Sequence, residues 1–201
     1  AMHGLVDSLE MYCTQNAVAQ FKPEQFHGQL FINTNPNLLC THDFVEQLLS
    51  LQRSTTAQIV IELSEQHAVT QLNELKRVVH RLRIAGLQFA IDDLGAGHSS
   101  LKLWAEIRPE YVKIDRYFVQ DIHLNPYKRE FVQHIVTLAK NMHATVIAEG
   151  IEKIEELRQV QKIGIFAAQG FFIGRPSTEV LADDRLQSLL HHDHQVERYD
   201  S

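Results

Sequence analysis

The chain has 201 residues, of which 44% are hydrophobic and 22% charged, and its formal net charge is −6 at pH 7. This size and composition are those of a globular protein with one core, so we expect a single domain over residues 1–201 that ends in a polar tail at 191–201. The acidic balance argues against a duplex nucleic-acid partner, and the lack of a signal peptide or membrane segment predicts a cytoplasmic protein.

Hydrophobic periodicity predicts helices and strands in alternation along the whole chain. The expected helices lie at 5–21, 43–51 (capped by Thr41), 68–85, 99–107, 121–143 (entered through Pro126), 154–163 and 180–190. The expected strands are short apolar runs at 29–33, 58–62, 87–92, 111–115, 144–149 and 164–169. Alternation of this kind indicates a parallel sheet covered by helices, either a barrel or a doubly wound sheet.

Polar side chains recur at the carboxyl ends of the predicted strands, at Asn33, Glu62, Asp92 with Asp93, Glu149 and Gln169. Lys113 lies within its strand and faces the same side as Asp115. A barrel would collect these positions on one face, where such folds keep their chemistry, and no Gly-rich nucleotide-binding turn favours the alternative. We therefore predict an α/β fold of the TIM type, a (β/α) barrel that is incomplete, with about six of eight strands. Open strand edges seek partners, so we expect a homodimer across the gap.

The stretch from Asp92 to Leu101 carries the strongest chemical signal. Adjacent residues of a strand point to opposite faces, so Asp92 and Asp93 can act on one object only if the backbone leaves the strand there. Gly95 and Gly97 permit such a turn. Paired carboxylates at a strand end suit Mg2+ or Mn2+, although an isolated Asp-Asp more often opens a solvated loop or caps a helix.

Six motifs occur in an order and at a spacing that resemble the EAL family of cyclic-di-GMP phosphodiesterases. They are Phe31-Ile32-Asn33, Ile61-Glu62-Leu63-Ser64-Glu65, the stretch from Asp92 to Leu101, Val112-Lys113-Ile114-Asp115-Arg116, Ala148-Glu149-Gly150-Ile151-Glu152, and Gln169-Gly170 through Arg175-Pro176. The resemblance implies hydrolysis of cyclic-di-GMP to the linear dinucleotide pGpG at a two-metal site that uses Mg2+ or Mn2+. It also implies that the parent protein can carry sensor or GGDEF domains.

The resemblance further implies a role for individual residues. Asn33, Glu62 and Asp92 would hold one metal, and Asp92 would bridge to a second metal that Asp93 also binds. Glu149 would lie at the second metal and its water as the candidate general base. Lys113 would position that water, Gln169 would complete the shell around it, and Glu152 would hold the loop after Asp93. Contacts to the substrate are implied for Asp115, Arg175 and Pro176.

The chain departs from the family pattern in two places. The Glu-x-Leu motif and the arginine that follows it would belong to a strand before residue 1, and Leu9-Glu10-Met11 does not replace them because it lies in a predicted helix. The central loop has Leu94, Ala96 and His98 where the family usually has Phe, Thr and Tyr. We therefore expect this chain to hydrolyse cyclic-di-GMP weakly or not at all. The alternative is a non-catalytic cyclic-di-GMP receptor or protein-interaction module.

Simpler structural roles compete with some of these assignments. Glu62 and Glu149 could stabilise helix N-termini, and Lys113 could form a buried pair with Asp115. Two further expectations concern packing rather than chemistry. Trp104, Phe171 and Phe172 are expected in the core rather than stacked on a guanine, and both cysteines, Cys13 and Cys40, are expected to be buried free thiols.

Overall fold

The computed structural model describes residues 2–21, 28–64, 69–95 and 100–177. The helix expected at 180–190, the polar tail at 191–201, and loop residues Ala96 and His98 lie outside these described residues. Among the described helices, none has both the length and the apolar character needed to cross a bilayer.

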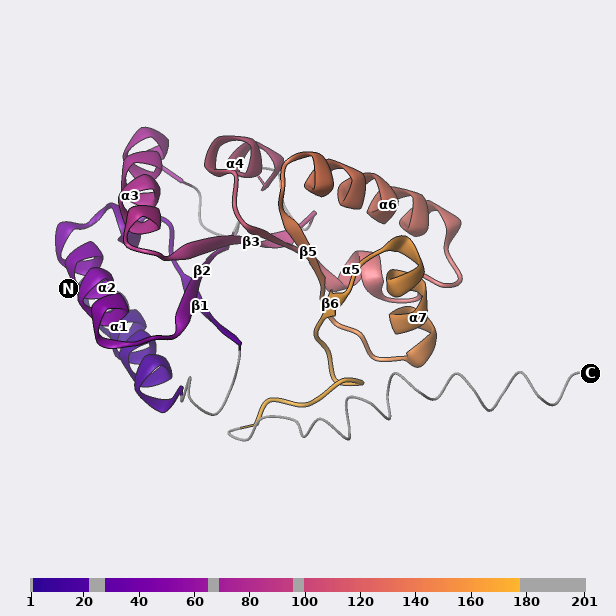
Figure 1. Cartoon of the computed structure of the whole chain (residues 1–201), viewed down its shortest axis with the longest axis horizontal. Coiled ribbons are helices and arrows are strands. Elements are labelled where there is room, and N and C mark those ends of the chain that lie inside the picture. The colour runs from indigo at the N-terminus through magenta and orange to yellow at the C-terminus, as the bar shows by residue number, and fades with distance from the viewer. Residues whose placement is uncertain (1, 22–27, 65–68, 96–99, 178–201) are drawn as a thin grey trace, which may run out of the picture.

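Six strands form one sheet in sequential order, and every neighbouring pair is parallel. The strands are β1 (Gln29–Thr34), β2 (Gln58–Ser64), β3 (Gln88–Leu94), β4 (Tyr111–Ile114), β5 (Thr145–Ala148) and β6 (Ala167–Ala168). The sheet curls into an open arc with the helices on its outer side, and β1 and β6 form its two edges (Figure 1). The predicted incomplete (β/α) barrel of six strands is therefore confirmed.

The helices largely follow the predicted periodicity. They are α1 (Met2–Gln20), α2 (His42–Ser54), α3 (Leu72–Ile84), α4 (Ser100–Ile107), α5 (Arg116–Val119), α6 (Pro126–Asn141) and α7 (Ile154–Ile163), with a 3-10 turn, η1, at Leu38–Cys40. Sequence periodicity missed α5 and η1 because elements of three or four residues complete at most about one turn. The last strand is also shorter than predicted, since Ala167–Ala168 are its two residues.

Two local predictions need correction. Thr41 does precede α2, but its side chain donates a hydrogen bond to the carbonyl of Leu38 at 2.7 Å instead of capping the helix. Cys13 is exposed rather than buried, because the buried side of α1 carries Met11, Thr14 and Val18. Cys40 is partly buried, and this burial raises the pKa of its thiol.

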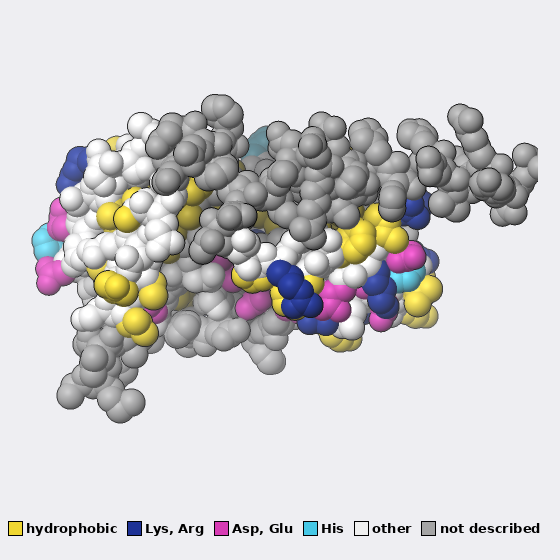
Figure 2. Space-filling model, turned by 90° about the horizontal axis from the view of Figure 1, so that it is seen from below, with side chains coloured by type: hydrophobic (Ala, Val, Ile, Leu, Met, Phe, Trp, Pro, Cys, Tyr) yellow, Lys and Arg dark blue, Asp and Glu magenta, His cyan; other side chains and the backbone are white. Residues whose placement is uncertain are grey.

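The core lies between the sheet and its helices. Trp104 of α4 is 1% exposed, as the sequence predicts, whereas the core position predicted for Phe171 is wrong because its side chain is exposed. The central strands β2 and β3 are buried along most of their length. Acidic, basic and hydrophobic side chains lie interspersed on the described part of the face that Figure 2 shows. The described residues of that face therefore form no large patch of a single charge sign.

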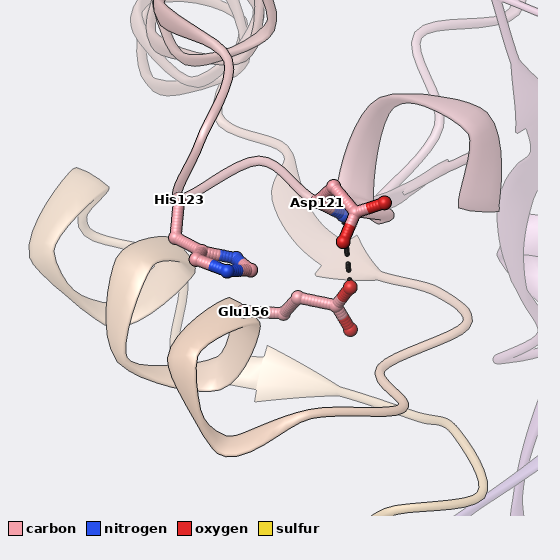
Figure 3. A group of neighbouring side chains, drawn as sticks. All are labelled: Asp121, His123 and Glu156. Carbon is pink, nitrogen blue, oxygen red and sulfur yellow. Dashed lines mark hydrogen bonds between the residues drawn. The ribbon is translucent and has the colours of Figure 1, made fainter.

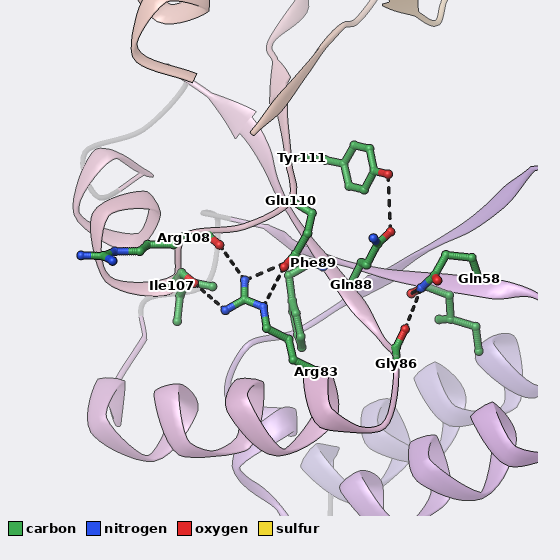
Figure 4. A network of polar contacts seen from close by, with 10 residues as sticks. Gln58, Arg83, Gly86, Gln88, Phe89, Ile107, Arg108, Glu110 and Tyr111 are labelled. Carbon is green, nitrogen blue, oxygen red and sulfur yellow. Dashed lines mark hydrogen bonds and ion pairs between the residues drawn. The ribbon is translucent and has the colours of Figure 1, made fainter. Parts of the chain in front are cut away.

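A polar network closes the sheet where its strands begin (Figure 4). Arg83 of α3 donates to Glu110 at 2.8 Å and to the carbonyls of Ile107 and Arg108 at 2.9 and 2.7 Å. Glu110 in turn accepts the backbone N–H of Phe89 at 2.8 Å, and the guanidinium lies 5.4 Å from the centre of the Phe89 ring. Each of these polar groups of Arg83 and Glu110 forms a hydrogen bond within the protein, so the network stabilises this end of the sheet.

Candidate functional site

The opposite end of the sheet, where the strands finish, brings together the predicted polar residues. The register sets Asn33 of β1 directly against Glu62 of β2. Ser64 of β2 lies beside Asp92 of β3, which places the Asp92 carboxylate on the next strand of the same rim. Parallel strands in sequential order thus collect residues that are far apart along the chain.

Lys113 of β4 lies at the centre of this rim. Its Nζ is 2.9 Å from Glu62 Oε1, 2.8 Å from Asp92 Oδ1 and 2.8 Å from Glu149 Oε1. All four residues are buried, and Lys113 is only 5% exposed. A single ammonium group therefore faces three buried carboxylates from three other segments. The cluster of these four side chains thus has more negative than positive charge.

This environment shifts the pKa values of its members. Burial would lower the pKa of Lys113, but the charges and hydrogen bonds of Glu62, Asp92 and Glu149 outweigh burial and raise it. Burial raises the pKa of Glu149 to about 7, with Asp92 and Asp93 adding to the rise and Lys113 opposing it. Burial also raises the pKa of Glu62 against the same lysine. Lys113 is therefore held charged, while Glu149 can gain or lose a proton near neutral pH.

The backbone leaves regular strand geometry between the two adjacent aspartates, as the sequence predicts. Asp93 has a φ of 54°, and the pairing of β3 with β4 shifts register between Ile91 and Leu94. Non-glycine residues seldom adopt positive φ, so the local fold must hold Asp93 there. As a result, oxygens of Asp92, Asp93 and Glu149 all lie within 4.8 Å of one another.

Two residues after Asp93, at the end of β3, the chain requires a glycine. Gly95 has a φ of 101°, and a side chain at this position would collide with the ring of Phe118. The close approach of Phe118 of α5 explains why a glycine is needed where the chain turns after Leu94.

A cavity of about 420 Å3 lies next to the cluster of carboxylates. Gln169 lines it and donates from its side-chain amide to Glu149 Oε1 at 2.5 Å, which connects the cavity to the buried carboxylates. Arg175 and Pro176 also line the cavity, and the guanidinium of Arg175 lies 4.7 Å from the centre of the Phe171 ring. The cavity therefore presents a cationic group and an aromatic face beside the carboxylates.

Two residues implied in the site have structural partners. Asp115 caps α5, since its carboxylate accepts the backbone N–H of Tyr117 at 2.8 Å, and the suggested buried pair with Lys113 is wrong because Lys113 faces other carboxylates. Glu152 lines the cavity and pairs with Arg116 at 2.8 Å. The loop that Glu152 was expected to hold includes residues 96–99, which are not described.

Arg116 was missed as a residue of this region. It lines the cavity and packs so closely on Gly150, which has a φ of 71°, that a side chain at position 150 would collide with it. The signal was present in the sequence, because Arg116 directly follows Asp115 in one of the six motifs.

A second group of possible ligands, Asp121, His123 and Glu156, lies away from the sheet rim (Figure 3). Glu156 is fully buried, and its carboxylate accepts the backbone N–H groups of Asp121, Glu152 and Lys153 at 2.8, 2.9 and 3.1 Å. Asp121 is paired with the Lys153 ammonium at 2.6 Å. These contacts occupy both carboxylates, so the group caps the start of α7 and does not resemble a vacant ligand set.

With this geometry in place, the comparison with known proteins identifies the class of the chain. The family model "EAL domain" matches residues 1–176, so the chain belongs to the EAL domain family. Cyclic di-GMP phosphodiesterase PdeF of Escherichia coli is 29% identical over 179 residues, which are 86% of this chain and 24% of PdeF. The chain thus spans about a quarter of the length of this relative.

Solved structures agree with the family assignment. A manganese and cyclic-di-GMP complex of Klebsiella pneumoniae BlrP1 is 33% identical with a TM-score of 0.76, covering 85% of this chain and 45% of that one. The EAL domain of Mycobacterium smegmatis DcpA is 28% identical with a TM-score of 0.75, covering 88% of this chain and 81% of that domain. The arc of six strands therefore corresponds to most of an EAL domain.

Proposed function

We propose that this chain is the core of a metal-dependent phosphodiesterase domain that hydrolyses cyclic-di-GMP to pGpG. The observation that carries the proposal is the convergence of Glu62, Asp92 and Glu149 on Lys113, with Asp93 turned towards the same place. The relatives named as cyclic-di-GMP phosphodiesterases and the BlrP1 complex with manganese and cyclic-di-GMP support it.

The residues fit a pair of divalent cations. Mg2+ and Mn2+ prefer oxygen ligands at about 2.1 Å, so two ligands of one ion lie up to about 4.2 Å apart, close to the spacing of Asp92, Asp93 and Glu149. Asn33 and Glu62, which lie opposite each other on β1 and β2, would hold the first ion together with Asp92. Asp92 would be shared with the second ion, beside Asp93 and Glu149.

Bound divalent ions would neutralise the phosphate and lower the pKa of a bound water. Glu149, whose carboxylate lies beside Asp92, Asp93 and Lys113, is placed to act as the general base that takes a proton from the attacking water. The water oxygen would then bond to phosphorus while the bond from phosphorus to the ribose oxygen breaks, and that ribose oxygen would take up a proton from solvent as the linear dinucleotide leaves. Lys113, held charged, would orient this water, and Gln169 would fix the Glu149 carboxylate through its hydrogen bond.

The adjoining cavity is the proposed place for the substrate. Arg175 can pair with a phosphate oxygen, and the exposed ring of Phe171 can stack on a guanine. Pro176 would complete the same wall. Asp115 and Glu152, which hold α5 and Arg116, would act on the substrate through these neighbours.

Incubation of the chain with MnCl2 and cyclic-di-GMP, followed by chromatography of the nucleotides, tests the proposal. Formation of pGpG, however slow, supports a phosphodiesterase. Binding of cyclic-di-GMP without pGpG would favour the alternative, a non-catalytic receptor or interaction module, and neither binding nor turnover would contradict both. The weak turnover, the homodimer, the sensor or GGDEF domains of the parent and the cytoplasmic location expected from the sequence stay predictions.

A further inference from the structure

The Glu10 carboxylate of helix α1 reaches the end of β1 that lies at the candidate site. Glu10 Oε2 accepts the backbone N–H of Asn35 at 3.2 Å, although the two residues are 25 positions apart. Met11 and Val18 anchor the same helix in the core, so the Glu10 side chain leaves from a fixed base. The sequence excluded Glu10 as a metal ligand because of its helix, and the structure shows that this helix still brings it to the strand end.

From Asn35 the hydrogen bonds continue to the segment that follows β2. The Asn35 side chain accepts the backbone N–H of Asn37 at 3.0 Å. Asn37 Oδ1 then accepts from the hydroxyl and the backbone N–H of Thr70, at 2.9 and 3.2 Å. Three segments, α1 and the connections that follow β1 and β2, are thus tied together above the strands that carry Asn33 and Glu62.

The end of β1 needs such a tether more than the other strand ends. Among the described strands, β1 pairs with β2 alone, so one side of its backbone lacks a strand neighbour. Asn33 is exposed there, and Asn35 follows it by two residues. Asn35 lies directly beyond Thr34, the last residue of β1, and only two residues after Asn33, so fixing the Asn35 backbone restricts the position of Asn33.

We propose that Glu10 is a positioning residue for the first metal site, acting through the Asn35 backbone on the Asn33 amide. The inference rests on the proposed function, because it assumes that Asn33 is a ligand. Residues that hold a metal ligand in place typically change metal affinity by about tenfold or more when removed. Glu10 acts at one further step, so we expect about a tenfold loss in Glu10→Ala, at the lower end of that range.

Mn2+ binding to the purified chain, followed by the free Mn2+ signal in electron paramagnetic resonance, tests this without reference to activity. Glu10→Ala removes the acceptor, and Glu10→Gln removes the charge but keeps an oxygen that can accept from Asn35. Glu130→Ala, on the exposed side of α6, is the matched control for the loss of one negative charge from a helix. Amide exchange at Asn35 reports directly whether its hydrogen bond has been lost.

The proposal expects Glu10→Ala to expose the Asn35 amide to exchange and to weaken Mn2+ binding, with Glu10→Gln and Glu130→Ala close to the wild-type chain. Unchanged Mn2+ affinity in Glu10→Ala, with faster Asn35 exchange or a lower melting temperature, would show that Glu10 has a structural role alone and would overturn the inference. Loss of affinity in Glu130→Ala as well would overturn it in favour of a general charge effect. Failure of the wild-type chain to bind Mn2+ would instead contradict the proposed function on which the inference rests.

Discussion

The two ends of one sheet each pair a basic side chain with carboxylate oxygens, but they balance charge differently. At the end where strands begin, one guanidinium, Arg83, meets one carboxylate, Glu110, and backbone groups satisfy the rest. At the other end, one ammonium, Lys113, faces three buried carboxylates, with Asp93 nearby as a fourth. Burial of charge is costly unless it is compensated, so the first end is complete as it stands, whereas the second calls for further positive charge.

The largest effect should come from neutralising Asp92, at the end of the sheet where carboxylates outnumber basic side chains. We expect Asp92→Asn to abolish any turnover of cyclic-di-GMP, because it removes the carboxylate that we propose is shared between two ions. The variant should fold, since the metal-free chain loses one of several crowded negative charges. Nucleotide chromatography and a melting curve measure both. Turnover at the wild-type rate would mean that the metal assignment is wrong.

Removal of the cation at the same end should act on stability. In the metal-free chain, Lys113→Met leaves the buried carboxylates without their ammonium partner, and we expect a loss of about 3 kcal/mol in the free energy of unfolding. Excess Mn2+ should recover part of this loss, because the ion supplies positive charge and binds the folded state. Urea denaturation with and without MnCl2 provides the measurement. An equal loss under both conditions would argue against ion binding at the carboxylates.

The balanced end offers the matched comparison. Arg83→Met leaves Glu110 and two carbonyl groups without their donor, and we expect a loss of about 1.5 kcal/mol by urea denaturation. Because this end has no surplus charge, the Mn2+ affinity of Arg83→Met should stay within about twofold of the wild-type value, as expected for a mutation far from the metal site. A large change in Mn2+ affinity here would mean that the two ends are not independent.

The smallest expected effect concerns pH. The pKa of Glu149 is raised to about 7, so below this pH a proton must leave before a metal can bind. Mn2+ affinity should therefore rise with pH, by up to about tenfold between pH 6 and pH 7 if one proton is released, and level off above pH 7. Calorimetric titration across this range tests the slope. Glu149→Gln should bind more weakly and show a shallower dependence, and an unchanged slope in this variant would assign the proton to another group.

The sequence predicted the fold and the rim of the site because both depend on local patterns. Apolar runs at strand length and polar residues at their ends suffice to place Glu62, Asp92 and Glu149 together, once the strands are parallel and sequential. The role of Lys113 as a common partner of three carboxylates could not be predicted, because it depends on how far the strands curl. The contact from Glu10 to Asn35 was missed for the same reason, since only packing of α1 on the sheet brings it there.

The most direct test of the account is the anomalous scattering of crystals soaked in MnCl2. We expect manganese peaks coordinated by Asp92, with Asp93 and Glu149 on one side and with Asn33 and Glu62 on the other, and a displaced Lys113 ammonium. A map without manganese at these carboxylates, or with manganese at Asp121, His123 and Glu156 instead, would contradict it.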